Sequence, residues 1–356
     1  MTVAMLAPVE RAVRRPPRQP THVPTRRRAA RSALLSGLAT FLAATVGLSL
    51  ALETVSPEWR EPEFGHRLML LQQKQPCVFV IGTSRTQNAI APHAMSRSPR
   101  VFNFGQSAAT PLKELLTLQR LLDSGVRPLA VVVELFPPAL AVNATDEAEL
   151  RERATRLSAK DLQHLTANRE NSAAFWCDWL AARATPWHTQ RQVLMSHCAP
   201  RWQPWQERID FQWATLDPDG FQPVAEVSPE RRAALTAVAR REWKDAFINF
   251  HAGESSVRAV RELVAVCRQN AIPVAFMVPP ISPEFRAAFA PGVLTEAESY
   301  LRTVSKELAV PVFPAMTDMT EDEFMDGHHM LKHGAERYSR WLADTHINPW
   351  LAGGRP

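Results

Sequence analysis

The stretch from Cys77 to Arg85 (Cys-Val-Phe-Val-Ile-Gly-Thr-Ser-Arg) constrains the fold more than any other part of the chain. A short, continuous apolar run that ends in glycine and small polar residues is typical of a strand buried on both faces, as in parallel sheets. Gly82 allows a sharp turn where the strand ends, so Ser84 is expected at the carboxyl edge of the sheet. Open α/β sheets bind their ligands at that edge. A lone serine there is nevertheless more often a cap or a turn residue.

Strand-like and helix-like segments alternate along the chain. Further strands are expected at 100–105, 128–135, 272–278 and 310–313. Helices are expected at 110–125, 255–267, 296–308 and 331–345. The alternation predicts an α/β fold, a three-layer α/β/α sandwich with a mostly parallel sheet and right-handed crossovers. Between the third and fourth strands, residues from about 140 to 250 form a Trp-rich insertion that we expect near the carboxyl edge of the sheet.

Residues 33–52 are a run of twenty residues without a charge, about the length that a helix needs to cross a bilayer. Arginines precede this segment and glutamates follow it, so the positive-inside rule keeps the amino terminus in the cytoplasm and exports the rest. A cleaved signal peptide and a buried core helix are the alternatives, but signal peptides usually have apolar runs of about 7–15 residues. We therefore expect one uncleaved, single-pass transmembrane helix in the inner (cytoplasmic) membrane.

The membrane segment divides the chain into parts. Residues 1–32, with eight arginines and one glutamate, are expected to be a disordered basic tail in the cytoplasm. After the membrane helix we expect a linker at 53–75, a periplasmic (extracytoplasmic) domain at 76–346 and a tail at 347–356. The net charge of the chain is +5 and that of residues 1–32 is +7, so the remainder is nearly neutral. The excess of basic residues therefore does not indicate nucleic-acid binding.

The four cysteines all follow the membrane segment, in a compartment that permits disulfides. Cys177 and Cys198 lie in one irregular region and could form a disulfide, whereas Cys77 and Cys267 fall on core elements and are expected to be buried thiols. The spacing of the cysteines and histidines matches no zinc pattern. No metal or cofactor is therefore expected.

A second polar motif, Asp-Gly-His-His, occupies residues 326–329. Asp326 and His329 are three residues apart, which lets the carboxylate hold the imidazole in one tautomer while the ring faces a serine. A serine, a histidine and an orienting acid are the components of an activated hydroxyl nucleophile. Alone, the motif would be an ordinary polar turn before a helix. Together with Ser84, it predicts a catalytic site.

The Gly-Thr-Ser-Arg turn that contains Ser84, together with the Asp-x-x-His motif, resembles the SGNH (GDSL-type) hydrolase superfamily. The resemblance covers residues 76–346 in layout and is limited to these two motifs in sequence. It implies that Ser84 is the nucleophile, His329 the general base and Asp326 the residue that orients the base. His328 fits the spacing of the family poorly as a base and is expected to line the pocket or contact solvent.

The same superfamily stabilises the oxyanion with a glycine amide after the second strand and an asparagine side chain after the third. Here Ala108 stands where glycine is usual, and its backbone N–H, with that of Ser84, is implied to bind the oxyanion. Gly105 is expected to supply the turn before it. No asparagine follows the third strand, and loss of one such donor typically costs about 10²–10³ in rate. Arg85 and Gln106 are the candidate replacement donors.

The chain is also similar to membrane-anchored SGNH-like proteins of alginate O-acetylation and teichoic-acid D-alanylation. This resemblance implies a serine-dependent O-acetylesterase or O-acyltransferase that acts on a cell-envelope polysaccharide or other acylated polymer. A multi-pass membrane O-acyltransferase is its implied partner. The tryptophans of the insertion could stack on sugars, although core packing or a place near the bilayer accounts for most of them. The alternative is a catalytically disabled polysaccharide-binding or scaffold protein of a polymer-acylation complex, which the missing asparagine favours.

Overall fold

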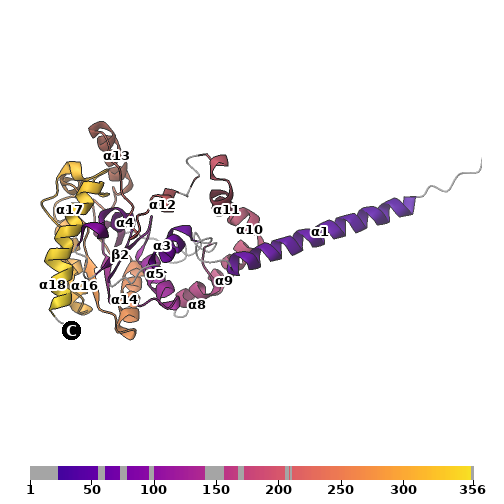
Figure 1. Ribbon diagram of the computed structural model, residues 1–356, viewed down its shortest axis with the longest axis horizontal. Coiled ribbons are helices and arrows are strands. Elements are labelled where there is room, and N and C mark those ends of the chain that lie inside the picture. Colours follow the sequence, from indigo (N-terminus) through magenta and orange to yellow (C-terminus); the bar gives the residue numbers. More distant parts are fainter. Residues whose placement is uncertain are drawn as a thin grey trace, which may run out of the picture. The chain divides into compact units, whose positions relative to one another are not determined.

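A computed structural model describes residues 23–54, 61–72, 78–95, 100–140, 156–166, 172–204, 208 and 211–353 (Figure 1). The protein is built around one five-stranded sheet in which all neighbouring strands are parallel, in the order β2-β1-β3-β4-β5. The strands are β1 (Val78–Gly82), β2 (Val101–Gly105), β3 (Ala130–Glu134), β4 (Val274–Met277) and β5 (Val312–Phe313). The predicted α/β class with a parallel sheet is confirmed, and each strand lies within a segment that the sequence assigns to a strand.

The first four strands are buried along their whole length. Because successive side chains of a strand point to opposite faces, alternate residues enter two different core clusters. Ile81 packs in a cluster with α5 (Pro111–Asp123) and α14 (Glu254–Gln269), whereas Val80 packs in a cluster with α17 (Lys332–Leu342). Burial of one such side chain contributes about 1.5–3 kcal/mol. The continuous apolar runs of the sequence therefore place these strands in the middle of the domain.

Local signals fix the ends of the helices that cover the sheet. The side chain of Thr110 accepts a hydrogen bond from the backbone N–H of Lys113 and so caps α5. Gly125, with a φ of 79°, follows the end of that helix. Between β4 and β5 lie α15 (Pro283–Ala287) and α16 (Val293–Glu307). These helices confirm the segments expected at 110–125 and 296–308.

The insertion between β3 and β4 contains only helices and turns among its described residues. The helices are α6 (Pro137–Leu140), α8 (Ala159–Thr166), α9 (Ser172–Ala184), α10 (Pro186–Thr189), α11 (Arg191–Cys198), α12 (Phe211–Ala214) and α13 (Pro229–Glu242). These helices follow the third strand and precede the fourth. The tryptophans of the insertion have different surroundings: Trp176 packs on the core cluster of α5, whereas Trp202 is 82% exposed.

The expected disulfide is not formed. Cys177 lies on α9 and Cys198 ends α11, and both thiols are exposed and unpaired. The intervening α10 separates the two helices in the chain, and each thiol contacts solvent instead of packing between them. Cys267 is buried and unpaired, as predicted. Cys77 lies outside the described residues.

The carboxyl terminus is more ordered than expected. After α17, a π-helical turn at Ala343–Ile347 continues into α18 (Asn348–Ala352), so the segment predicted as a tail is partly helical. Ile347 is buried, and the ring of Trp350 lies 5.7 Å from that of Phe313. These apolar side chains pack against the short strand β5, which is why the helix extends beyond the predicted end.

Two segments before the sheet also differ from the expectations. Helix α1 (Val23–Thr54) begins ten residues before the predicted membrane segment, because alanine and arginine favour helix and nothing interrupts its propagation. The part of α1 from Arg27 to Ala51 is long and apolar enough to cross a membrane or to be a signal sequence. Residues 1–22 of the predicted disordered tail lie outside the described residues. Helix α3 (Pro62–Gln72), inside the predicted linker, buries Phe64 in the core cluster of α5.

Candidate active site

Ser84 is the first residue of the short helix α4 (Ser84–Ala89), which follows β1 directly. The side chain of Thr83 caps this helix by accepting a hydrogen bond from the backbone N–H of Arg85. A Cβ atom on Gly82 would lie 2.1 Å from Oγ1 of Thr86. Only glycine therefore allows the chain to turn this closely, and the turn places Ser84 at the carboxyl edge of the sheet, as predicted.

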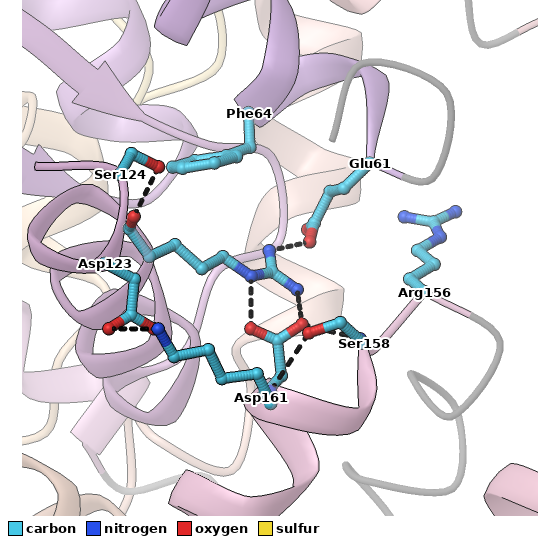
Figure 2. A pocket seen from close by; sticks show the side chains of 9 residues that line it. Glu61, Phe64, Asp123, Ser124, Arg156, Ser158 and Asp161 are labelled. Carbon is cyan, nitrogen blue, oxygen red and sulfur yellow. Dashed lines mark hydrogen bonds and ion pairs between the residues drawn. The ribbon is translucent and has the colours of Figure 1, made fainter. Parts of the chain in front are cut away.

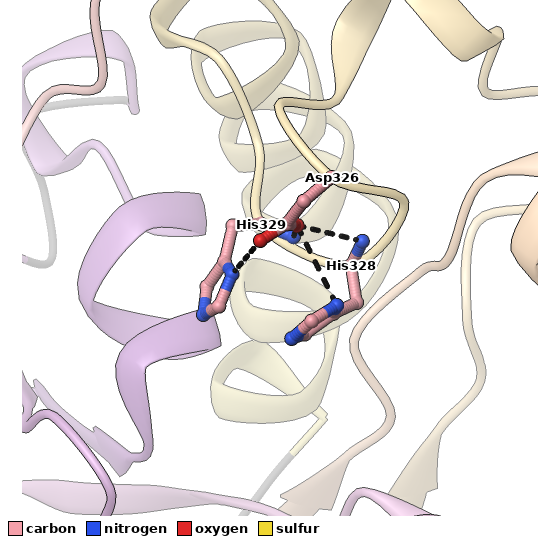
Figure 3. A group of neighbouring side chains, drawn as sticks. All are labelled: Asp326, His328 and His329. Carbon is pink, nitrogen blue, oxygen red and sulfur yellow. Dashed lines mark hydrogen bonds and ion pairs between the residues drawn. The ribbon is translucent and has the colours of Figure 1, made fainter. Parts of the chain in front are cut away.

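His329 approaches Ser84 from the loop before α17, 245 residues later in the chain. Nε2 of His329 lies 2.8 Å from Oγ of Ser84, and Nδ1 lies 2.7 Å from Oδ2 of Asp326. Figure 3 shows the carboxylate of Asp326 between the two neighbouring histidines. The structure thus brings together the three residues that the sequence motifs predict, in the order serine, histidine, carboxylate.

Hydrogen bonds within the loop hold this arrangement. Oδ1 of Asp326 accepts hydrogen bonds from the backbone N–H groups of His328 and His329, at 3.2 and 2.9 Å. Gly327 has a φ of 90°, a left-handed conformation that glycine adopts without strain. Asp326 therefore has two functions, because one oxygen shapes the loop while the other orients the imidazole.

The carboxylate of Asp326 is ionised. Burial would raise its pKa, but the hydrogen bond and the charge of His329, together with His328, hold the pKa well below its usual value. A carboxylate so placed fixes the Nδ1–H tautomer of His329 and leaves Nε2 free to accept the proton of Ser84. The geometry can therefore activate the serine hydroxyl as a nucleophile.

His328 does not reach the serine. Its buried ring lies 4.1 Å from the ring of His329 and packs against Phe285, at 5.1 Å, and Trp243, at 6.2 Å. Burial lowers the pKa of His328 well below its usual value, and the positive charge of Arg85 acts in the same direction. His328 is therefore a neutral, buried neighbour of His329, and the geometry selects His329 as the base.

Asp326, His328 and His329 also offer three ligand atoms that all lie within 4.8 Å of one another, a spacing that could hold a metal ion. Both ring nitrogens of His329 already face partners, and both oxygens of Asp326 already accept hydrogen bonds. A metal ion on His329 would have to displace Ser84 from Nε2 or Asp326 from Nδ1. The nearby charge of Arg85 also opposes a cation. The arrangement fits proton transfer better than metal binding.

Sequence reasoning missed Glu134, the last residue of β3, which is 2% exposed. Its carboxylate accepts hydrogen bonds from the backbone N–H and hydroxyl of Thr83, from those of Thr86, and from Nε of Arg85. Burial would raise its pKa, but the charge of Arg85 and these hydrogen bonds hold the pKa below its usual value. An ionised carboxylate thus anchors the turn on both sides of Ser84. The available signal was a single acidic residue at the end of the apolar run Ala-Val-Val-Val.

Arg85 lies in the site, as the sequence suggested, and is only 3% exposed. Its guanidinium pairs with Glu134, with Nε 2.9 Å from Oε1. The guanidinium carbon lies 3.6 Å from the centre of the Phe136 ring and 5.6 Å from that of Trp243. Cation–π contacts of this kind fix the plane of the guanidinium. Arg85 is therefore a rigid, buried cation next to Ser84 in the chain.

The turn after β2 lies beside the turn that carries Ser84. Gly105 is the register partner of Gly82, and the backbone N–H of Gln106 donates a 3.0 Å hydrogen bond to the carbonyl oxygen of Gly82. Ala108 has a φ of 49°, in the left-handed region that favours glycine. This conformation gives a physical reason for glycine at the equivalent position of the superfamily that the chain resembles.

Two expected contributors have structural positions instead. A Cβ atom on Gly105 would lie 2.2 Å from the backbone nitrogen of Gln87, so glycine is needed for the close approach of β2 to α4. The amide nitrogen of Gln106 donates a 2.8 Å hydrogen bond to Oγ1 of Thr117 on α5. The Gln106 side chain therefore points into the core, and its expected function as a replacement oxyanion donor does not fit the structure.

A pocket of about 120 Å³ lies away from these residues, among α3, α5 and α8 (Figure 2). Most of its charged side chains are paired: Arg120 pairs with Asp161 and Glu61, and Lys160 pairs with Asp123 at 2.9 Å. None of the lining residues belongs to the site of Ser84. The paired charges indicate a structural ion-pair network that joins three helices.

No protein-family model matches this chain, and no curated protein matches it significantly.

Proposed function

We propose that the protein is a serine-dependent acyl enzyme of the SGNH type, with a three-layer α/β/α domain and activity as an O-acetylesterase or O-acyltransferase. One observation carries the proposal: Oγ of Ser84 lies 2.8 Å from Nε2 of His329, whose Nδ1 lies 2.7 Å from Oδ2 of Asp326. Serine is a weak nucleophile until a base within hydrogen-bond reach accepts its proton.

In the proposed reaction, Oγ of Ser84 attacks the carbonyl carbon of an ester while Nε2 of His329 takes the hydroxyl proton. Asp326 stabilises the imidazolium that forms. The backbone N–H groups of Ser84 and Ala108 are the donors that the resemblance implies for the oxyanion. The tetrahedral intermediate collapses as His329 returns the proton to the leaving alcohol, which leaves an acyl group on Ser84. Water or a sugar hydroxyl then attacks this acyl group by the same steps.

The substrate class and location follow from the resemblance and from α1. The apolar part of α1 anchors the protein in the inner (cytoplasmic) membrane, with the amino terminus in the cytoplasm and the site in the periplasm. The substrate is an acylated cell-envelope polysaccharide, and the partner is a multi-pass membrane O-acyltransferase. The support for this part is the arginine-rich flank of the apolar segment and the combination of the serine motif with a membrane anchor.

A fluorophosphonate probe tests the proposal directly on the full chain in detergent. We expect stoichiometric labelling of Ser84, located by peptide mass mapping, and no labelling of Ser84→Ala or His329→Ala. The matched control is Ser107→Ala, because Ser107 lies in the neighbouring turn and is part-buried but does not contact His329. If the probe does not label correctly folded protein, the proposed serine-dependent activity is wrong.

The alternative is a scaffold protein that keeps the fold without the reaction. The observation in its favour is that Leu135 and Phe136, both buried and apolar, follow β3 where the superfamily has its asparagine. The two functions differ in cells. If Ser84→Ala supports normal acylation of the envelope polymer, the protein is a scaffold.

A further inference from the structure

The proposed reaction leaves one buried charge next to the nucleophile without a function. Arg85 follows Ser84 directly and is 3% exposed. Among the described residues, the guanidinium bonds through Nε alone, in the 2.9 Å hydrogen bond to Oε1 of Glu134. Among the residues that the structure describes, no hydrogen bond to Nη1 or Nη2 of Arg85 is formed. A guanidinium normally uses its fork of donors on planar anions, so these Nη groups are available to a ligand.

The position of this donor edge is fixed. Glu134 holds the Nε side of the guanidinium, and the ring of Phe136 covers one face at 3.6 Å. Trp243 lies 5.6 Å away. The ring of Trp243 also lies 6.2 Å from that of His328, which places the guanidinium on the side of the catalytic loop. A donor that is held in advance does not have to reorganise when charge develops near it.

We infer that the Nη groups of Arg85 donate hydrogen bonds to the carbonyl oxygen of the acyl group as Ser84 attacks it, and so replace the asparagine that is absent after β3. This inference rests on the proposed function. As the bond between Oγ and the carbonyl carbon forms, the π electrons of the carbonyl move to its oxygen, and the proton of Ser84 moves to His329. Arg85 keeps all its protons and stabilises the negative oxygen until the leaving alcohol departs.

The balance of charges favours an oxyanion over a substrate carboxylate as the ligand. Glu134 and Asp326 are ionised and buried, and Arg85 is the cation that faces them. A carboxylate on the acyl group would bring another buried anion that no cation balances. The oxyanion instead forms together with the imidazolium of His329, so the total charge of the site is unchanged. The site is therefore suited to uncharged acyl groups such as acetyl.

A thiono ester tests this function of Arg85. In p-nitrophenyl thionoacetate sulfur replaces the carbonyl oxygen, and N–H donors stabilise negative sulfur less than negative oxygen. The full chain in detergent is assayed with p-nitrophenyl acetate and with this analogue. For Arg85→Lys, which keeps a charge opposite Glu134 but loses the fork, kcat for the oxygen ester should fall about 10²–10³-fold with little change in KM. The kcat for the thiono ester should fall less, so the ratio of the oxygen-ester rate to the thiono-ester rate should decrease.

Thr86→Val is the matched control. It removes the hydrogen bond from the hydroxyl of Thr86 to Glu134 and so disturbs the same turn, but it keeps the guanidinium of Arg85. The rates for the two esters should fall by the same factor, so their ratio should not change. If Arg85→Lys does not fold, judged by circular dichroism, the double variant Arg85→Gln, Glu134→Gln replaces the ion pair by two amides and should show the same lowered ratio.

Two results would overturn the inference. The first is a ratio in the Arg85 variants equal to that of the wild type. The second is selective loss of p-nitrophenyl hemisuccinate hydrolysis with the acetate rate retained, because Arg85 would then bind an acyl carboxylate. Failure of the proposed function is a separate result: wild-type protein that neither hydrolyses p-nitrophenyl acetate nor reacts with the fluorophosphonate probe.

Discussion

Oε2 of Glu134 accepts a 2.6 Å hydrogen bond from the hydroxyl of Thr86, two residues beyond Ser84. The same carboxylate also accepts hydrogen bonds from Thr83 and Arg85. The residue before Ser84 and the two residues after it therefore all bind the carboxylate at the end of β3. A buried carboxylate thus fixes the position of the nucleophile. Both the stability of the domain and the geometry of the site therefore depend on Glu134.

Glu134→Gln should destabilise the domain strongly. The change leaves the buried guanidinium of Arg85 without the carboxylate that it pairs with, and breaking such a pair typically costs about 3–5 kcal/mol. Urea unfolding followed by circular dichroism measures the free energy of unfolding. Adding Arg85→Met to Glu134→Gln should recover part of the loss, because no buried charge then remains unpaired. If Glu134→Gln alone is as stable as the wild type, the ion pair does not contribute to the free energy of unfolding.

Stability should decrease in acid because of the same carboxylates. The folded-state pKa of Glu134 is below its ordinary value of 4.5, and that of Asp326 is below 3.8. Groups with depressed pKa values stabilise the fold above their unfolded pKa and lose this contribution as pH falls toward the folded pKa. The urea midpoint should therefore fall between about pH 5 and pH 3. Glu134→Gln should show a smaller fall over this range, and an equal fall would assign the effect to other carboxylates.

The fold could be predicted where local patterns carry the information. The apolar run of β3 and the Thr110 cap of α5 are encoded in neighbouring residues, and both are present. The helices before and after the sheet could not be predicted in the same way. Single residues such as Phe64 of α3 and Trp350 of α18 pack on distant parts of the core. Periodicity does not report which distant surface a short segment will cover.

The site shows the same division. Ser84, Asp326 and His329 could be predicted because each lies in a short motif with a chemical reason for its spacing. Glu134 could not, because its hydrogen bonds join residues 48 to 51 positions apart. The side chain of Gln106 could not be oriented either, because its partner Thr117 lies on the next helix. Side-chain direction depends on packing that a linear pattern does not contain.

Ala108→Gly should stabilise the protein. Ala108 has a φ of 49°, a conformation that costs an L-residue about 1–2 kcal/mol, against about 0.4–1 kcal/mol for the greater freedom of glycine in the unfolded chain. The expected gain is between zero and about 1.6 kcal/mol in the free energy of unfolding. The adjacent buried Ala109, mutated to glycine, serves as the control and should destabilise. Because the backbone N–H is kept, the esterase rate of Ala108→Gly should not decrease.

Helix α1 should remain in the mature protein as a membrane anchor. Arginines precede its uncharged segment at residues 33–52, and glutamates follow it, which favours an amino terminus in the cytoplasm. A reporter that is active only outside the cytoplasm, fused after the last residue, should be active. Amino-terminal sequencing of the membrane-bound protein should find residues before 33. A mature amino terminus near residue 53 would instead identify a cleaved signal sequence.

Ser84 and His329 should behave as one unit in kinetics. Each of Ser84→Ala and His329→Ala removes the activated nucleophile, so each should lower kcat for p-nitrophenyl acetate by at least about 10³-fold, and the double variant should lose no more than either alone. His328→Gln is the matched control, because this buried ring is next to His329 but does not contact the serine. It should lower kcat far less. Since burial keeps the pKa of His328 well below its usual value, the pH at which activity is half-maximal should also be unchanged in His328→Gln. A shift of that pH, or a loss as large as that of His329→Ala, would transfer the function of the base to His328.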